Sequence, residues 1–297
     1  MARRRSRQDL DPAFDYCVEH VRRYDHDRFL TAQFAPADRR NALLALYAFN
    51  IEISKVREVV AEPVLGQMRL QWWRDVMEAI FAGSPPSNEI ARALSHTVRQ
   101  FTLDREKMGR LINAREFDLL DEAPDDLAAL EHYLDASAAE LADLALTILG
   151  IGAEDKSTRA AARHVSLAFG LSGIVRATPF LAAQRRTMIP KASLAAAGIR
   201  PDDLFTGRPV PGLGDAARHL AERAVLHLEQ AASDPKRGTD GRRVGAPVFL
   251  WGRLAGYDLA RLRKSGFDPY DPRLAKTGTG RLLALIGAGL SPRRFLG

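Results

Sequence analysis

The 297-residue chain has a single cysteine, Cys17, so no internal disulfide can form. Such sparse cysteine use suits a reducing compartment. No stretch approaches the run of about 18 apolar residues that a transmembrane helix requires, so we expect none. The basic start, MARRRSRQDLDPAF, lacks the apolar core of a secretory signal. We therefore expect a cytoplasmic protein, and its net charge of +6 favours peripheral attachment to the inner face of an anionic membrane.

Several functional signatures are also missing. The chain has no zinc-finger cysteine set, no aromatic string of the kind found in RNA-binding sheets and no dense basic helix, so we expect no nucleic-acid partner. It also lacks GxGxxG, Walker, HExxH and GxSxG motifs, which argues against the enzyme classes that depend on them. Alternating β-branched segments are almost absent, so no sheet is expected.

Helical periodicity fills the sequence instead. Apolar residues recur at helical spacing over 36–60, 65–82, 88–101, 104–120, 127–149, 157–181, 191–197, 214–232, 246–264 and 279–290. Pro179 predicts a kink or an end of its helix. The Gly-, Pro- and Asp-rich stretches 201–214 and 234–247 are expected to be loops. We predict one all-α domain over 25–290, preceded by a basic tail and the start of a first helix in 1–24 and followed by a tail in 291–297.

Several short stretches of the sequence occur in a characteristic order. They are DRFL at 27–30, FAP at 34–36, YAF at 47–49, QWWR at 71–74, AFGLSGIVR at 168–176 and RRTMIP at 185–190. Together they resemble the squalene/phytoene synthase family, the head-to-head prenyl synthases. The resemblance implies an isoprenoid-synthase fold, which is a helical bundle around a central cavity.

The chain departs from that family at its two aspartate motifs. The resemblance puts the first motif at Ser54, Lys55 and Glu58, and the second at Ala177 and Leu181. Acids spaced i and i+4 share a helix face and can hold Mg²⁺, which helps a diphosphate to leave. Since only Glu58 keeps an acid, we expect no metal cofactor and a non-catalytic protein.

Lys55 suggests a different use of the same cavity. It replaces a metal ligand with a fixed cation, and with Arg176 and Arg57 or Arg69 it could bind a phosphate or diphosphate without metal. The expected ligands are an isoprenoid diphosphate or an anionic lipid. The candidate binding residues in this vestigial cavity are Ser54, Lys55, Glu58, Asp118 and Arg176.

One branch of the family shares this form of degeneracy. The segments NIEISKVREVV, GIVRATPF and SGFDPYDP resemble the branch that contains a mitochondrial assembly factor for respiratory complex I and its bacterial relatives. The resemblance implies a role in assembling or stabilising complex I, with subunits of that complex as partners.

Two alternatives stay open. The chain could be an active head-to-head prenyltransferase that condenses two prenyl diphosphates with Mg²⁺, held by Glu58, Glu62 and Asp118. It could also be a helical scaffold whose pocket has collapsed around Phe180 and Leu181. Among the aromatic residues, the pair Trp72-Trp73 is expected to place one ring in the core and leave the other partly exposed.

Overall fold

The computed structural model describes residues 11–60, 62–233, 239–275 and 279–289, and within these ranges every regular element is helical. The expected all-α architecture is therefore confirmed. The chain divides into two compact units. Unit 1 takes the residues up to Leu120, Glu140–Asp155 and Val244–Pro247. Unit 2 takes Asp121–Ala139, Lys156–Arg243 and the residues from Val248 onward.

Unit 1 is built around helix α4 (Ala37–Ser54). Its other elements are α2 (Asp11–Tyr24), α3 (His26–Ala32), α5 (Val56–Val59), α6 (Pro63–Phe81), α7 (Glu89–Phe101), α8 (Arg105–Ala114), the 3₁₀ turn η1 (Phe117–Leu119) and α10 (Glu140–Leu149). Helices α2, α7 and α10 all pack against α4. The middle of α4, Leu43–Phe49, is buried on every side as a result. This explains why its sequence is apolar all round rather than amphipathic.

A glycine closes the contact between α4 and the end of α10. Gly150 has φ of +88°, a left-handed conformation that glycine adopts without strain. A Cβ atom here would lie 2.6 Å from Nη1 of Arg39. That same Nη1 donates a 2.7 Å hydrogen bond to the carbonyl of Ile148, one of the last carbonyls of α10. Arg39 therefore provides a hydrogen-bond donor to a carbonyl at the end of α10. The side chain has room to reach that carbonyl because residue 150 is a glycine.

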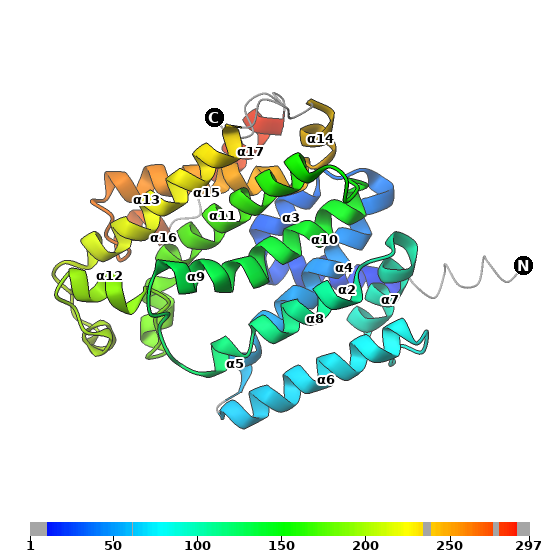
Figure 1. The fold of residues 1–297 in the computed structure, drawn as a ribbon, viewed down its shortest axis with the longest axis horizontal. Coiled ribbons are helices and arrows are strands. Elements are labelled where there is room, and N and C mark those ends of the chain that lie inside the picture. The colour runs from blue at the N-terminus through cyan, green and yellow to red at the C-terminus, as the bar shows by residue number, and fades with distance from the viewer. Residues whose placement is uncertain (1–10, 61, 234–238, 276–278, 290–297) are drawn as a thin grey trace, which may run out of the picture. The chain divides into compact units, whose positions relative to one another are not determined.

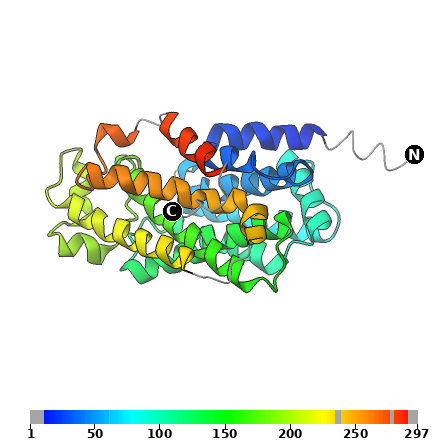
Figure 2. The same cartoon turned by 90° about the horizontal axis from the view of Figure 1, so that it is seen from above.

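Unit 2 is built around the long helix α11 (Lys156–Ala183). Its other elements are α9 (Leu127–Leu134), the π-helical turn η2 (Asp135–Ala139), α12 (Lys191–Ala196), the 3₁₀ turn η3 (Pro201–Thr206), α13 (Leu213–Ala232), α14 (Thr239–Val244), α15 (Ala246–Lys264), α16 (Pro272–Ala275) and α17 (Thr279–Gly289). Helix α13 packs along α11. Helices α13 and α15, yellow and orange, lie side by side in both views (Figures 1 and 2).

The structure corrects several expected boundaries. The helix predicted over 36–60 breaks at Lys55, and the one predicted over 104–120 ends at Ala114 and resumes as η1. The expected loops contain η3 and α14, and residues 234–238 lie outside the described ranges. Helix α11 continues through Pro179 to Ala183 instead of ending there. Proline removes one backbone hydrogen bond, but the packing of α11 against its neighbours in unit 2 outweighs that loss.

Helix α11 bears on the expectation that the chain has no transmembrane helix. By length and composition it is the one helix, among the described residues, that could cross a membrane. Polar residues interrupt its apolar run, so the sequence alone shows no unbroken apolar stretch of that length. Of its most apolar window, 61% is buried inside the structure. Such burial is typical of a helix in the core of a soluble protein.

Candidate functional site

Lys55 lies at the break between α4 and α5. Its backbone, at φ −91° and ψ 2°, ends α4, and its N–H donates to the carbonyl of Ile51 at 3.0 Å. The ammonium Nζ lies 3.3 Å from the centre of the Tyr24 ring, a cation–π contact with α2. Burial lowers the pKa of Lys55, while Glu58 and Glu52 act in the opposite direction. The aromatic face thus fixes a half-buried cation in unit 1.

A second charged group lies one turn earlier on α4. Glu52 accepts a 3.0 Å hydrogen bond from Nη2 of Arg69 on α6, and Nε2 of His20 on α2 lies 3.2 Å away. The pKa of Glu52 is lowered, first by its interaction with His20 and also by Arg69, against the opposing effect of burial. The cation of Arg69 is therefore already partly neutralised. Lys55 differs from Arg69 because its ammonium is held on an aromatic ring, whereas the guanidinium of Arg69 is held by a carboxylate.

The structure places Ser54, Glu58 and Asp118 in unit 1 as well, but not as a metal-ligand set. The Ser54 hydroxyl donates to the carbonyl of Ile51 at 3.1 Å, and Glu58 is exposed. Asp118 in η1 lies 3.5 Å from Arg115, which donates to Asn50 on α4 at 3.3 Å. Asp118 is thus part of a polar link between η1 and α4.

Arg176 belongs to unit 2 and is held by a buried carboxylate. Its Nη1 donates to Oδ2 of Asp258 on α15 at 3.0 Å. The two oxygens of Asp258 also accept from Nη1 of Arg281 on α17, at 2.8 and 3.0 Å. The side chains of Asp258 and Arg281 are only 7% and 6% exposed, whereas that of Arg176 is 34% exposed. Arg176 is therefore partly exposed, and its bond to Asp258 links α11 to α15 and, through Arg281, to α17.

The two positions that the resemblance assigns to the second motif have apolar side chains. Ala177 and Leu181, on the same helix as Arg176, are half-buried. Phe180, which the scaffold alternative assigns to filling a collapsed pocket, is 53% exposed. Its ring is therefore not interior filling.

The geometry argues against a metal centre and against a cysteine nucleophile. Among the described residues, no group of three or more His, Cys, Asp and Glu side chains is arranged to hold a metal ion. The residues at the motif positions thus do not fit a Mg²⁺ cluster, which needs several oxygen ligands. Cys17 is buried, and burial raises its pKa to about 12. A thiol of this kind stays protonated at neutral pH and is a poor nucleophile.

Unit 2 contains a histidine network. Nδ1 of His164 on α11 lies 3.0 Å from Nδ1 of His227 on α13, so one ring donates and the other accepts. The Nε2 of His227 lies 2.9 Å from Glu131 on α9, which also accepts from Arg223. Burial raises the pKa of Glu131, but the hydrogen bonds from Arg223 and His227 outweigh it and lower the pKa. The network links three helices.

Helix α6 exposes an apolar stripe. It packs against α8 and α7 in unit 1, and Figure 1 shows it alongside α8. Four large apolar side chains nevertheless remain exposed on one side of its first half: Val64, Leu65, Met68 and Trp72. They follow the i, i+1, i+4, i+8 spacing of a single helix face. Contiguous exposed apolar surface of this kind marks an interaction site more often than isolated exposed residues do.

The helical architecture is that of the isoprenoid synthases. The structure superimposes on the squalene synthase of Alicyclobacillus acidocaldarius with a TM-score of 0.75, covering 88% of this chain and 97% of that one at 21% sequence identity. The chain belongs to the squalene/phytoene synthase family, whose model matches residues 21–281. The resemblance inferred from the short stretches is therefore confirmed.

Named relatives fall into two groups. The chain is 30% identical to human NADH dehydrogenase (ubiquinone) complex I, assembly factor 6, over 265 residues that cover 89% of this chain and 78% of the human protein. It is 24% identical to chloroplastic phytoene synthase 1 of Zea mays, over 94% of this chain and 68% of the maize protein. The similarity to the assembly factor is thus the stronger of these two.

Proposed function

We propose that this protein is a non-catalytic member of its family that assists the assembly or stability of respiratory complex I. Its similarity to the human assembly factor over most of both chains supports the role. The observation that carries the proposal is the lysine at position 55 and its contact with Tyr24. At a position where the family resemblance expects a metal-binding acid, the chain holds a cation against the Tyr24 ring. A cation there repels Mg²⁺ and removes the electrophilic help that diphosphate departure needs.

The second motif position supports the same conclusion. Alanine and leucine at 177 and 181 offer no oxygen to a hard cation. The neighbouring Arg176 donates to Asp258 and is partly exposed. With one acid left at the first motif and none at the second, the protein keeps a frame that can bind a ligand but lacks the acid pairs that would help pyrophosphate to leave.

The same residues support a metal-free binding role. Lys55 offers an ammonium that is held on the Tyr24 ring, and the side chain of Arg176, in the other unit, is 34% exposed. Either group suits phosphate oxygens, which accept charge-assisted hydrogen bonds. We assign an isoprenoid diphosphate or an anionic lipid head group as the ligand of Lys55, with Ser54, Glu58 and Asp118 of the same unit as further candidate contacts.

The exposed stripe on α6 is a suitable surface for the protein partner. Met68, 64% exposed, lies at its centre, with Leu65 and Trp72 on either side. A surface of this kind can cover an apolar segment of a complex I subunit before that subunit meets its final neighbours. It also suits a protein that works at the inner face of a membrane, where such subunits are inserted.

Binding and turnover on the purified protein test the non-catalytic role. We expect farnesyl diphosphate to bind equally well with Mg²⁺ and with EDTA, and no pyrophosphate to be released. Lys55→Glu is expected to weaken binding roughly tenfold, or about 1.4 kcal/mol, because it places a like charge beside the ligand. Arg99→Glu, which makes the same charge change at an exposed position elsewhere in unit 1, is the control.

Two results would contradict this account of the site. Release of pyrophosphate that depends on Mg²⁺ would establish an active prenyltransferase and return Glu58, Glu62 and Asp118 to consideration as ligands. Equal binding by Lys55→Glu and the unchanged protein would show that Lys55 does not contact the ligand.

A further inference from the structure

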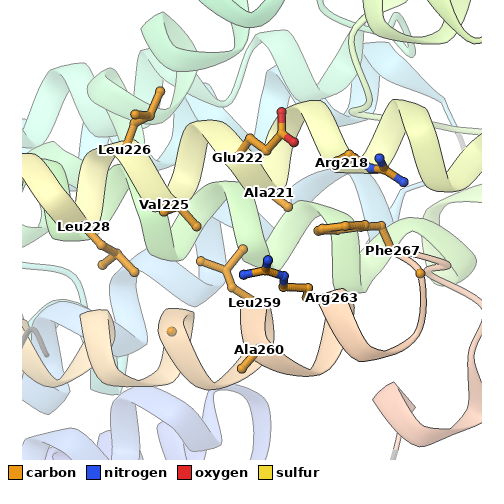
Figure 3. A pocket seen from close by; sticks show the side chains of 12 residues that line it. Arg218, Ala221, Glu222, Val225, Leu226, Leu228, Leu259, Ala260, Arg263 and Phe267 are labelled. Carbon is orange, nitrogen blue, oxygen red and sulfur yellow. The ribbon is translucent and has the colours of Figure 1, made fainter.

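A groove in unit 2 lies between α13 and α15, on residues that the assembly role does not use. Its volume is about 850 Å³, and Phe267 lies at one end (Figure 3). That volume falls within the range of pockets that bind small molecules. All residues that line the groove belong to unit 2, so the groove is formed within that unit.

Apolar side chains line much of the groove. Val225 and Leu228 line it from α13, and Leu259 lines it from α15. Leu259 is buried and forms part of the floor, whereas Val225 is exposed on the wall. The stretch from Arg218 to Leu228 on α13 covers about 15 Å at the helical rise per residue. A narrow apolar channel of this length suits an extended hydrocarbon chain.

The end near Phe267 is basic. Arg218 lies over the Phe267 ring, 5.1 Å from its centre, and 3.4 Å from Asp215. In Figure 3, the guanidinium of Arg263 lies in the space between the two helices, next to Leu259 and Phe267. No acidic side chain within the described ranges forms an ion pair with Arg263. Glu222 also lines the groove, and in the same view its carboxylate points to the side of α13 away from α15.

We propose that this groove binds a free single-chain amphiphile with an anionic head group, such as a long-chain fatty acid. The chain lies over Val225, Leu228 and Leu259, and the head group pairs with Arg263 and Arg218. Charge complementarity selects the anion, because a cationic head group is repelled by two arginines and a neutral one forms weaker hydrogen bonds with them. The site is separate from Lys55 and goes beyond the assembly role.

The shape of the groove favours a single chain over larger occupants. Part of its apolar surface, including Leu259, is buried in the floor. A flat bilayer does not reach a concave floor, and a peptide helix about 10 Å wide would rest on the walls. A hydrocarbon chain can enter the channel and remove both walls and floor from water.

Calorimetric titration of the full-length protein with dodecanoate tests the proposal. We expect dodecanoate to bind, dodecanol to bind at least tenfold more weakly, and acetate not to bind. Arg263→Glu removes the cation, and Val225→Trp fills the channel from an exposed position without altering charge. Each variant is expected to weaken dodecanoate binding about tenfold. Arg208→Glu, an exposed position in the same unit, and Lys55→Glu are expected to bind like the unchanged protein.

Three results would contradict the proposal. Equal affinity for dodecanol and dodecanoate would overturn the role of the arginines. Unchanged binding by Val225→Trp, with its thermal unfolding also unchanged, would place the ligand elsewhere. If dodecanoate does not bind but vesicles containing phosphatidylglycerol do, and Arg263→Glu abolishes that binding, the surface contacts a membrane and the single-chain proposal is wrong.

Discussion

Asp258→Asn is expected to lower the free energy of unfolding by about 3–5 kcal/mol, because it leaves a buried arginine without its counter-charge. Asp258 is the shared acceptor for Arg176 on α11 and Arg281 on α17. Both Asp258 and Arg281 are almost completely excluded from solvent. The neutral amide keeps the size of the side chain but removes the charge that makes burial of the guanidinium tolerable. The polar contacts that join helices α11, α15 and α17 are then weaker.

Urea unfolding followed by circular dichroism measures this loss. Asp202→Asn is the matched control, since Asp202 is exposed and is expected to shift the free energy of unfolding by no more than about 0.5 kcal/mol. If Asp258→Asn unfolds at the same urea concentration as Asp202→Asn, the three-residue ion network does not stabilise unit 2.

Trp73→Ala is expected to cost about 3–5 kcal/mol of unfolding free energy, whereas the neighbouring Trp72→Ala costs about 1 kcal/mol or less. Trp73 is 1% exposed and its ring meets Phe49 of α4 edge to face, 5.2 Å between centres. Trp72 is 43% exposed, and its ring meets that of Trp73 at 4.8 Å. Truncating the buried ring leaves a cavity between α6 and α4, but truncating the exposed ring mainly removes surface.

The two tryptophan variants control for each other because they change the same residue type one position apart. Thermal unfolding of both, beside the unchanged protein, is the measurement. Equal losses of stability would show that α6 does not pack on α4 through Trp73. They would also remove the basis for treating the Trp72 side of α6 as free surface.

The fold was readable from the sequence because its signals are local. Helical spacing and breakers identified most of the helices, and the pair Trp72-Trp73 divided into one buried and one exposed ring as expected. The break at Lys55 was missed because the apolar pattern runs on through Val56, which is also buried. Of the kink or end predicted at Pro179, the end is not found, because α11 runs on to Ala183. Tertiary packing carried the helix past a residue that breaks isolated helices.

The surroundings of the candidate site were harder to predict because its contacts join distant parts of the chain. Arg176 and Asp258 are 82 residues apart, and nothing in the spacing of either helix pairs them. One signal was available, since Asp258 is an acid within the largely apolar segment 246–264. Such acids often have a buried counter-charge. The contact of Lys55 with Tyr24 had no comparable signal, because it depends on how α2 packs beside α4.

Deletion of the gene in its native organism, followed by measurement of assembled complex I and its NADH oxidation in membranes, tests the proposed role most directly. We expect both to fall and to be restored by the unchanged gene. Met68→Asp, in the middle of the α6 stripe, should fail to restore them, whereas Leu283→Asp, at another exposed apolar position, should succeed. Unchanged complex I after deletion, together with loss of a prenyl-derived product, would contradict the assembly role and favour an active synthase.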